Sequence, residues 1–237
     1  MKRTRTFIYA MVALLSAAFT LQSCLDDDDD NYISIDPDTA VGIVTLKPSQ
    51  SNDGSWLIQL TDSSFAQCSN IKKYPYGDKE YRAYIYFKYD SEPNLTCVLP
   101  SITITHIDTL LTKPLAPALE SAEANDMAYG NDPVEIVKSW ETSAEDGYMN
   151  IRFRTNWLPG SRHRVSLVRI ADEDGMPTFV FHHDAQGQTG GQTGDGMVAF
   201  FIDLPIDTDR VPGNIKIKWK SFTGEKSQTF KYIPRSN

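Results

Sequence analysis

The chain has 237 residues, of which 41% are hydrophobic and 11% aromatic, and it carries 31 acidic against 23 basic residues. The formal net charge of −8 makes it a poor electrostatic partner for nucleic acid, whose phosphates bind clustered lysine and arginine. A chain of this length and apolar content can bury one full hydrophobic core or two modest ones.

Residues 1–23 have the order of a secretory signal peptide. Three basic side chains lie within the first five positions, and residues 7–21 carry no charge. This apolar stretch is shorter than the roughly 20 residues that a membrane-spanning helix needs. It ends in Leu21-Gln22-Ser23-Cys24, which resembles the bacterial lipobox. We therefore expect removal of residues 1–23 and lipid attachment to Cys24, with acyl chains such as palmitate as the anchor. An ordinary cleaved signal with a chance cysteine is the alternative.

Five consecutive aspartates occupy residues 26–30 and cannot pack against one another, so they stay hydrated. We expect residues 24–37 to form an acidic tether between the lipid and the folded part. Without the three signal-peptide cations, 20 basic and 31 acidic residues give the mature chain a net charge of −11. An acidic stretch after a lipidated cysteine resembles the signal for display on the cell surface in lipoproteins of the Bacteroides group. A spacer without address information, on the periplasmic face of the outer membrane, is the alternative.

Two cysteines remain once Cys24 carries lipid. Cys68 and Cys97 form an even pair, and an envelope compartment permits disulfides. A bridge between them would close a loop of about 30 residues and contribute roughly 3–4 kcal/mol to stability. Two buried free thiols, which pack like small apolar side chains, are the alternative.

Hydrophobic side chains alternate with period two along most of the mature chain, which is typical of half-buried strands. The clearest alternation runs through residues 81–89, 149–154 and 215–220. Further strand-like runs, separated by turn-forming residues, are 41–47, 56–61, 97–107, 134–140, 163–170, 178–182, 197–204 and 228–233. The pattern predicts an all-β protein with frequent hairpins.

Residues 114–133 interrupt this rhythm, because they are rich in proline, alanine and turn formers and lack period two. We therefore predict a linker there, between two domains. The strand-like runs in residues 38–113 suit an OB-like five-stranded barrel. Roughly seven runs in residues 134–237 suit an immunoglobulin-like β-sandwich.

Six of the eleven tyrosines lie within residues 74–89. Aromatic rings on an OB-like barrel can stack on sugars or bases, and the acidic charge disfavours bases. A glycan or a protein is then the expected ligand. The side chains predicted for this ligand face are Trp56, Tyr74, Tyr76, Tyr84 and Tyr86. Tyrosine also suits a half-exposed strand surface, so a purely structural role is the alternative.

No pattern in the sequence indicates catalysis, a cofactor or a metal site, so we predict a protein without enzymatic activity. His182 and His183 are neighbours on a predicted strand and point to opposite faces, so they cannot chelate one ion without a bulge. No nucleophile elbow and no zinc-type histidine spacing stands out.

Short motifs follow one another in a set order along the mature chain. They are Cys24-Leu25 with the aspartate run, and residues 107–113, 130–136, 147–151 and 163–168. In this order the chain resembles the NigD-like lipoproteins of Bacteroides and relatives. The resemblance implies an N-terminal OB-like barrel, a C-terminal β-sandwich and no known reaction. We expect a lipid-anchored interaction protein of the envelope or cell surface whose ligand is an envelope protein or a glycan. The alternatives are a glycan-binding accessory lipoprotein and a role in bacteriocin immunity.

Overall fold

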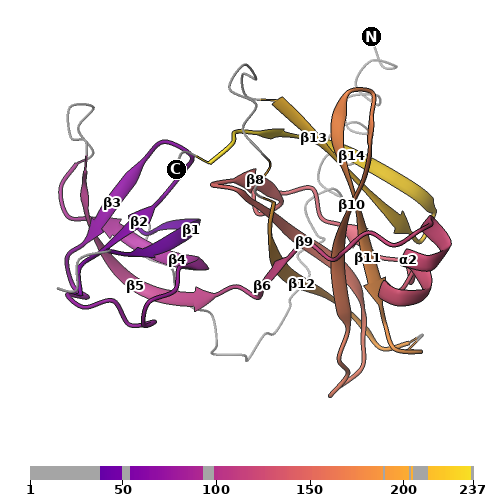
Figure 1. The fold of residues 1–237 in the computed structure, drawn as a ribbon. Helices are drawn as coiled ribbons and strands as arrows, with labels where there is room; N and C mark the ends of the chain where they lie inside the picture. The colour runs from indigo at the N-terminus through magenta and orange to yellow at the C-terminus, as the bar shows by residue number, and fades with distance from the viewer. Residues whose placement is uncertain are drawn as a thin grey trace, which may run out of the picture. The chain divides into compact units, whose positions relative to one another are not determined.

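The computed structural model describes residues 38–49, 54–92, 99–188, 190–202, 204 and 213–235 (Figure 1). The predicted signal peptide, the acidic tether, Cys24 and Cys97 lie outside these residues, so the predictions about them stay predictions. Within the described part of the chain, no helix is both long and apolar enough to cross a membrane.

Five strands close into a barrel in the N-terminal part of the described chain. Their bounds are β1 Ala40–Pro48, β2 Trp56–Gln59, β3 Phe65–Cys68, β4 Tyr81–Tyr89 and β5 Ser101–Thr109. They are hydrogen-bonded in the order β1-β2-β3-β5-β4, and β4 pairs with β1 to complete the ring (Figure 1). Only β3 and β5 are parallel among these pairs of described strands. The predicted OB-like five-stranded barrel is confirmed.

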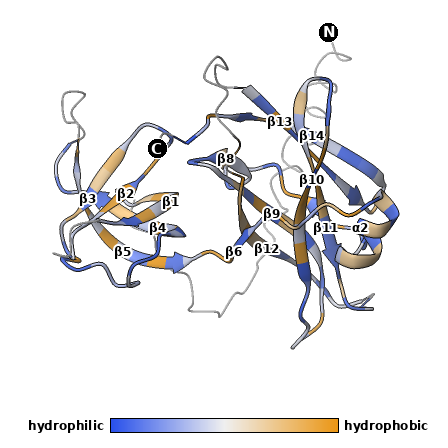
Figure 2. Cartoon of the chain, in the orientation of Figure 1, coloured by the Kyte–Doolittle hydropathy of each residue, from blue (hydrophilic) through white to orange (hydrophobic). Residues whose placement is uncertain are grey.

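The alternation along β4 separates the inside of the barrel from its outside. Ala83, Ile85 and Phe87 point inward and are at most 6% exposed, while Tyr84 and Tyr86 point outward. Figure 2 shows hydrophobic and hydrophilic residues alternating along the strands. The other buried members of the barrel core are Val44, Leu46, Trp56, Ile58, Ala66, Tyr74, Ile102 and Ile104.

Two sheets form a sandwich in the C-terminal part. The first has the order β10-β11-β13-β14, with bounds Arg164–Glu173, Met176–Asp184, Gly213–Ser221 and Gly224–Tyr232. The second has the order β6-β12-β9-β7, with bounds Thr112–Pro114, Gln192–Phe201, Tyr148–Trp157 and Glu135–Ile136, and β8 Ser143–Glu145 pairs with β9. Both sheets contribute to one hydrophobic core. The predicted all-β fold with a C-terminal sandwich is confirmed.

A helix, α2 Ala122–Tyr129, lies within the segment predicted as a linker. Its N-cap is Ser121, whose hydroxyl accepts a hydrogen bond from the Ala124 N–H at 3.1 Å. It ends at Gly130, which has a φ of 89°. A side chain there would come within 2.5 Å of the His183 carbonyl oxygen, so the end of the helix is pressed against β11.

The segment 114–133 therefore belongs to the sandwich instead of separating the two domains. Strand β6 pairs in parallel with β12, and Ala116 forms a bridge with Val168 of β10. The chain passes from the last barrel strand to the first sandwich strand at Leu110 and Leu111. Contacts with distant parts of the chain determine the structure of this segment, so no period-two pattern in its sequence could predict it.

A buried polar seam joins the barrel to the sandwich, and Arg82 lies at its centre. Arg82 points outward from β4 and is 0% exposed. Its guanidinium donates hydrogen bonds to Thr45 Oγ1 at 2.9 Å and to Asn150 Oδ1 at 3.3 Å. It also lies 3.7 Å from Glu145 Oε2 and 5.4 Å from the centroid of the Tyr148 ring. Thr45 belongs to the barrel and the other three partners to the sandwich, so one side chain connects both domains.

A second set of charges extends the seam to the C-terminal end of the described chain. Asp146 is 1% exposed and lies 3.1 Å from Lys47 and 3.4 Å from Arg235. Arg235 donates two hydrogen bonds of 2.6 Å to the Glu80 carboxylate, which also accepts one from the Tyr148 hydroxyl. Burial raises the pKa of Glu80, but these hydrogen bonds outweigh it and hold the pKa below its ordinary value. The two domains are thus held together by ion pairs and hydrogen bonds between oppositely charged side chains.

Candidate functional site

Two of the five predicted ligand-face residues lie inside the barrel. Trp56 is 6% and Tyr74 7% exposed. The indole N–H of Trp56 donates to the Ile71 carbonyl at 2.9 Å, and the Tyr74 hydroxyl lies 3.1 Å from the Leu46 carbonyl and 2.7 Å from that of Lys79. The expectation that Trp56 and Tyr74 face a ligand is wrong, because these large rings fill the barrel core and their polar atoms are bonded internally.

Tyr76 is half-buried and also packs against the barrel core. Its ring centroid lies 5.7 Å from that of Tyr74 and 5.3 Å from that of Tyr81. It therefore continues an internal aromatic cluster and does not join the outer face of β4.

The remaining two tyrosines belong to an aromatic patch on the outside of the barrel, which consists of Tyr84, Tyr86, His106 and Trp140. The centroids of neighbouring rings are 5.8 Å apart for Trp140 and Tyr84, 5.7 Å for Tyr84 and Tyr86, and 5.7 Å for Tyr86 and His106. Trp140 is 54% exposed, and the side chain of His106 is 55% exposed. The sequence predicted only the two tyrosines, because Trp140 comes from the turn between β7 and β8 of the sandwich.

Hydrogen bonds hold the turn that carries Trp140. The Thr142 hydroxyl donates to the Val137 carbonyl at 2.7 Å, and the Arg152 N–H donates to the Thr142 hydroxyl at 3.1 Å. Arg152 also pairs with the carboxylate of Glu141 at 2.9 Å. Trp140 is therefore presented to solvent from a turn that hydrogen bonds and an ion pair hold in place.

Polar groups and a small hollow border the aromatic patch. Asp108 lies opposite Tyr84 in the β4/β5 register, and its Oδ2 is hydrogen-bonded to His106 Nε2 at 2.8 Å. A hollow of about 250 Å³ beside Trp140 is lined by residues of β1 and β8 and by Leu60. Burial, followed by the neighbouring Tyr86, raises the pKa of Tyr84, so its hydroxyl is protonated at neutral pH and can donate a hydrogen bond.

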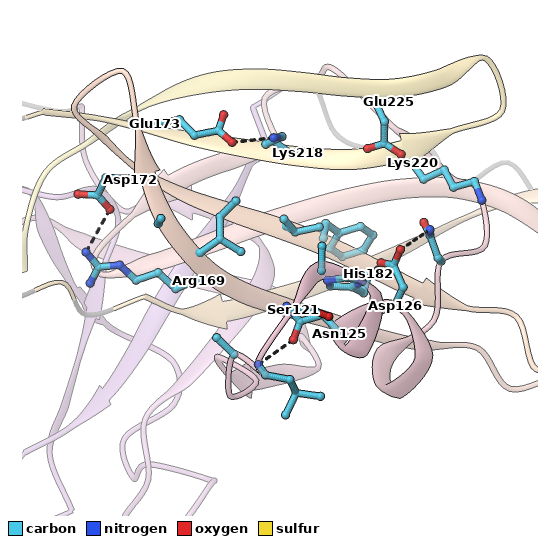
Figure 3. Close-up of a pocket in the computed structure, with 18 residues that line it drawn as sticks. Ser121, Asn125, Asp126, Arg169, Asp172, Glu173, His182, Lys218, Lys220 and Glu225 are labelled. Atoms are coloured by element: carbon cyan, nitrogen blue, oxygen red, sulfur yellow. Dashed lines mark hydrogen bonds and ion pairs between the residues drawn. The ribbon is translucent and has the colours of Figure 1, made fainter.

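A larger cavity of about 630 Å³ lies between α2 and the outer face of the β10-β11-β13-β14 sheet (Figure 3). Its floor includes Val180. Two of the cations that line it are engaged, since Lys218 lies 2.7 Å from Glu173 and Arg169 lies 3.5 Å from Asp172. Figure 3 shows both pairs. The charged rim of this cavity is thus largely paired within the protein.

His182 and His183 lie on opposite faces of β11, as predicted, and have separate partners. His182 lines the large cavity, with Nδ1 3.0 Å from the Gly130 carbonyl and 3.4 Å from Asp126. Its Nε2 is buried and has no partner among the described residues.

On the other face, His183 Nε2 lies 2.8 Å from His163 Nδ1, and the His163 ring stacks on Trp157 at 4.1 Å. Burial, followed by the nearby His163, lowers the pKa of His183. In the described part of the chain, no three histidine, cysteine or acidic side chains gather closely enough to hold a metal ion.

Cys68 ends β3 and is half-buried, with its sulfur 3.2 Å from Asn70 Oδ1 and 3.4 Å from the Ile71 nitrogen. Its predicted partner Cys97 lies outside the described residues. Their disulfide therefore stays a prediction.

The barrel, the sandwich and the seam define a two-domain β protein, and comparison with known proteins gives its family. Residues 116–232 match the NigD-like C-terminal beta sandwich domain. This match confirms the resemblance to the NigD-like family found in the sequence. No protein of curated function matches the chain.

Several solved structures share the fold across both domains. A protein of Parabacteroides distasonis described as toxin related is 26% identical, with a TM-score of 0.66 over 82% of this chain and 93% of that one. A NigD-like immunity protein of Bacteroides caccae is 18% identical, with a TM-score of 0.59 over 82% and 97%. A Bacteroides fragilis protein described as a lipoprotein is 13% identical, with a TM-score of 0.54 over 84% and 99%. The barrel and sandwich therefore recur together in this group of bacteria.

Proposed function

We propose that this chain is a non-enzymatic binding protein of the bacterial envelope, anchored in the outer membrane through lipid on Cys24, and that the aromatic patch is its docking surface. The observation that carries the proposal is the exposed Trp140 ring in contact with Tyr84. Exposed tryptophan and tyrosine side chains are typical anchors of binding sites. A structural relative described as a lipoprotein also supports the anchoring.

The absence of enzymatic activity is supported by how the charged groups are used. The buried charges of the seam are paired within the protein and fasten the domains: Arg82 pairs with Glu145, and Asp146 pairs with Lys47 and Arg235. His182, the histidine of the large cavity, has its second nitrogen buried. An active site needs convergent titratable groups with access to a substrate.

Anchoring is tested by metabolic labelling with an alkyne fatty acid, in cells that produce the native chain or its Cys24→Ala variant. We expect label on the native chain only, and removal of the protein from intact cells by added protease. A native chain without label would contradict the anchoring. A labelled chain that resists protease until the outer membrane is opened would place the protein on the periplasmic face.

Docking is tested with a photo-cross-linking amino acid introduced at position 140 and, as the matched control, at Phe222. Phe222 is 52% exposed and lies on the turn between β13 and β14. We expect envelope adducts from position 140 that position 222 does not give. Identical adduct patterns from both positions would remove the aromatic patch as the docking surface.

A role in bacteriocin immunity is the second candidate, and it is favoured by the relatives described as toxin related and as a NigD-like immunity protein. In that case the docking surface would bind a toxin or its receptor. Deletion of the gene should then sensitise cells to the cognate toxin. Unchanged sensitivity would end this candidate and leave the first proposal intact.

A further inference from the structure

We infer that the aromatic patch binds a neutral glycan chain. This inference rests on the proposed function and names the ligand of the same surface. Pyranose rings have apolar C–H faces and a rim of hydroxyl groups, so a protein surface that binds them must supply both aromatic faces and nearby polar atoms. Tyr84, Tyr86, His106 and Trp140 supply such a surface, since their rings follow one another at centroid distances of 5.7–5.8 Å.

The aliphatic side chains next to the two tyrosines on β1 are at least half-buried. Val41 and Ile43 of β1 lie opposite Tyr86 and Tyr84 in the register, and Ile43 is only 5% exposed. Half-exposed tyrosines and the exposed Trp140 therefore form the contact area. Stacking of a planar ring on such side chains depends little on the exact sequence of the ligand, and it adds up along a chain of several units.

Charge favours a neutral ligand over an anionic one. The charged side chains near the patch are Asp108, opposite Tyr84 on β5, and Glu145, which lines the hollow beside Trp140 and pairs with Arg82. Glu141 and Arg152 also act on Tyr84, and they pair with each other at 2.9 Å. Carboxylates accept hydrogen bonds from sugar hydroxyl groups and repel phosphate, sulfate and uronate groups. The whole chain has an excess of acidic residues, 31 against 23 basic ones, and this negative charge also disfavours an anionic ligand.

The shape of the surface favours a chain over a small enclosed ligand. The hollow beside Trp140 has a volume of about 250 Å³, below the roughly 300–1,000 Å³ of pockets that enclose small molecules. One sugar ring can sit in this hollow against Trp140 while the following units lie over Tyr84 and Tyr86. Because the binding groups come from both domains, the seam that fixes the domains also fixes the spacing of the subsites.

The test uses the protein from residue 24 onward, with Cys24→Ser to keep it in solution. An array of neutral and anionic glycans identifies the tightest ligand, and calorimetry with that oligosaccharide compares variants. We expect a neutral glycan to bind, and Trp140→Ala and Tyr86→Ala each to weaken binding by about tenfold, which is within the range of one lost stacking contact. The matched control Phe222→Ala, which removes another exposed aromatic ring, should leave the affinity within about twofold.

The inference is overturned if no neutral glycan binds, if a polyuronate binds more tightly than every neutral glycan, or if Phe222→Ala and Trp140→Ala weaken binding equally. The cross-linking experiment keeps the two proposals apart. A protein adduct specific to position 140, together with an array on which nothing binds, overturns the glycan inference and leaves the docking surface standing. Neutral glycan binding that does not change in Trp140→Ala overturns the inference for this surface.

Discussion

The outer face of β4 has two regions with opposite roles, although their side chains have the same parity in the sequence. At one end Arg82 is completely buried beneath the sandwich and bonded to groups of both domains. Two and four residues further along, Tyr84 and Tyr86 come to the surface and meet rings from β5 and from the sandwich turn. The same strand thus fastens the domains at one end and presents an aromatic surface at the other.

The difference shows that the alternation of a strand decides only which side chains point away from the barrel core. What covers them depends on the neighbouring domain. A covered charge must have its hydrogen bonds satisfied, because an unpaired buried charge is very costly. An uncovered aromatic ring costs little and remains available for a ligand. Substitutions in the buried seam should therefore lower the stability of the fold much more than substitutions in the aromatic patch.

The largest effect is expected for Arg82→Ala. It removes the cation that pairs with Glu145 and the donor to Asn150 Oδ1 at the centre of the seam. Breaking a buried pair in this way costs about 3–5 kcal/mol. Urea unfolding measures the loss. Arg154→Ala is the control, because Arg154 forms its ion pair with Asp195 at an exposed site and should cost little. Equal stability of the two variants would contradict the buried seam.

A smaller and pH-dependent effect is expected for Glu80→Gln. The pKa of Glu80 is held below its ordinary value of 4.5, so its charged form stabilises the fold above that pH. This contribution is lost as the pH falls below 4.5 and through the folded-state pKa. Unfolding free energies of the native chain and the variant should therefore differ most at neutral pH and converge as the pH falls through the folded-state pKa of Glu80. A difference that grows on acidification would show that the Arg235 and Tyr148 hydrogen bonds do not act as described.

Tyr148→Phe should cost about 1–1.5 kcal/mol, roughly one net hydrogen bond. The substitution removes the hydrogen bond to Glu80, which keeps both bonds from Arg235, and it retains a ring face under Arg82. Combining Tyr148→Phe with Glu80→Gln in a double-mutant cycle measures their coupling. Strictly additive losses would mean that these two side chains do not interact.

The smallest effect on stability is expected for Trp140→Ala, within about 0.5 kcal/mol, as for other exposed side chains. Its ring is 54% exposed, and the turn is held by Thr142 and Arg152 instead. Thermal unfolding of this variant should overlay that of the native chain even where ligand binding is lost. A large drop in melting temperature would make Trp140 a structural residue and weaken its assignment to the aromatic patch.

Much of the fold could be predicted because the alternation of hydrophobic and polar side chains along a strand can be recognised in the sequence. Residues 81–89 were predicted as a strand and form β4, and the run at 41–47 lies within β1. The short strands β3, β6 and β8 were missed, since three or four residues carry too little pattern. The run at 134–140 was predicted as one strand, but only β7 is regular there and Trp140 lies in a turn.

The candidate site was only partly predictable, for a different reason. Tyr84 and Tyr86 could be found because they alternate with inward side chains on one strand. Tyr74 could not be placed, because it lies outside regular strands and only the closed barrel shows that it points into the core. Trp140 is 56 positions from Tyr84 in the sequence numbering, and no local pattern connects the two rings.

The sequence by itself determined the all-β class, the order of barrel and sandwich and the family, because side-chain alternation and the succession of short motifs are local properties. The tertiary structure alone decided which polar and aromatic side chains are covered. Burial depends on what packs against a strand from a distant part of the chain, as the sandwich packs on Arg82 and leaves Tyr86 partly exposed. For that reason the seam and the aromatic patch, which lie on one strand, could be told apart only in three dimensions.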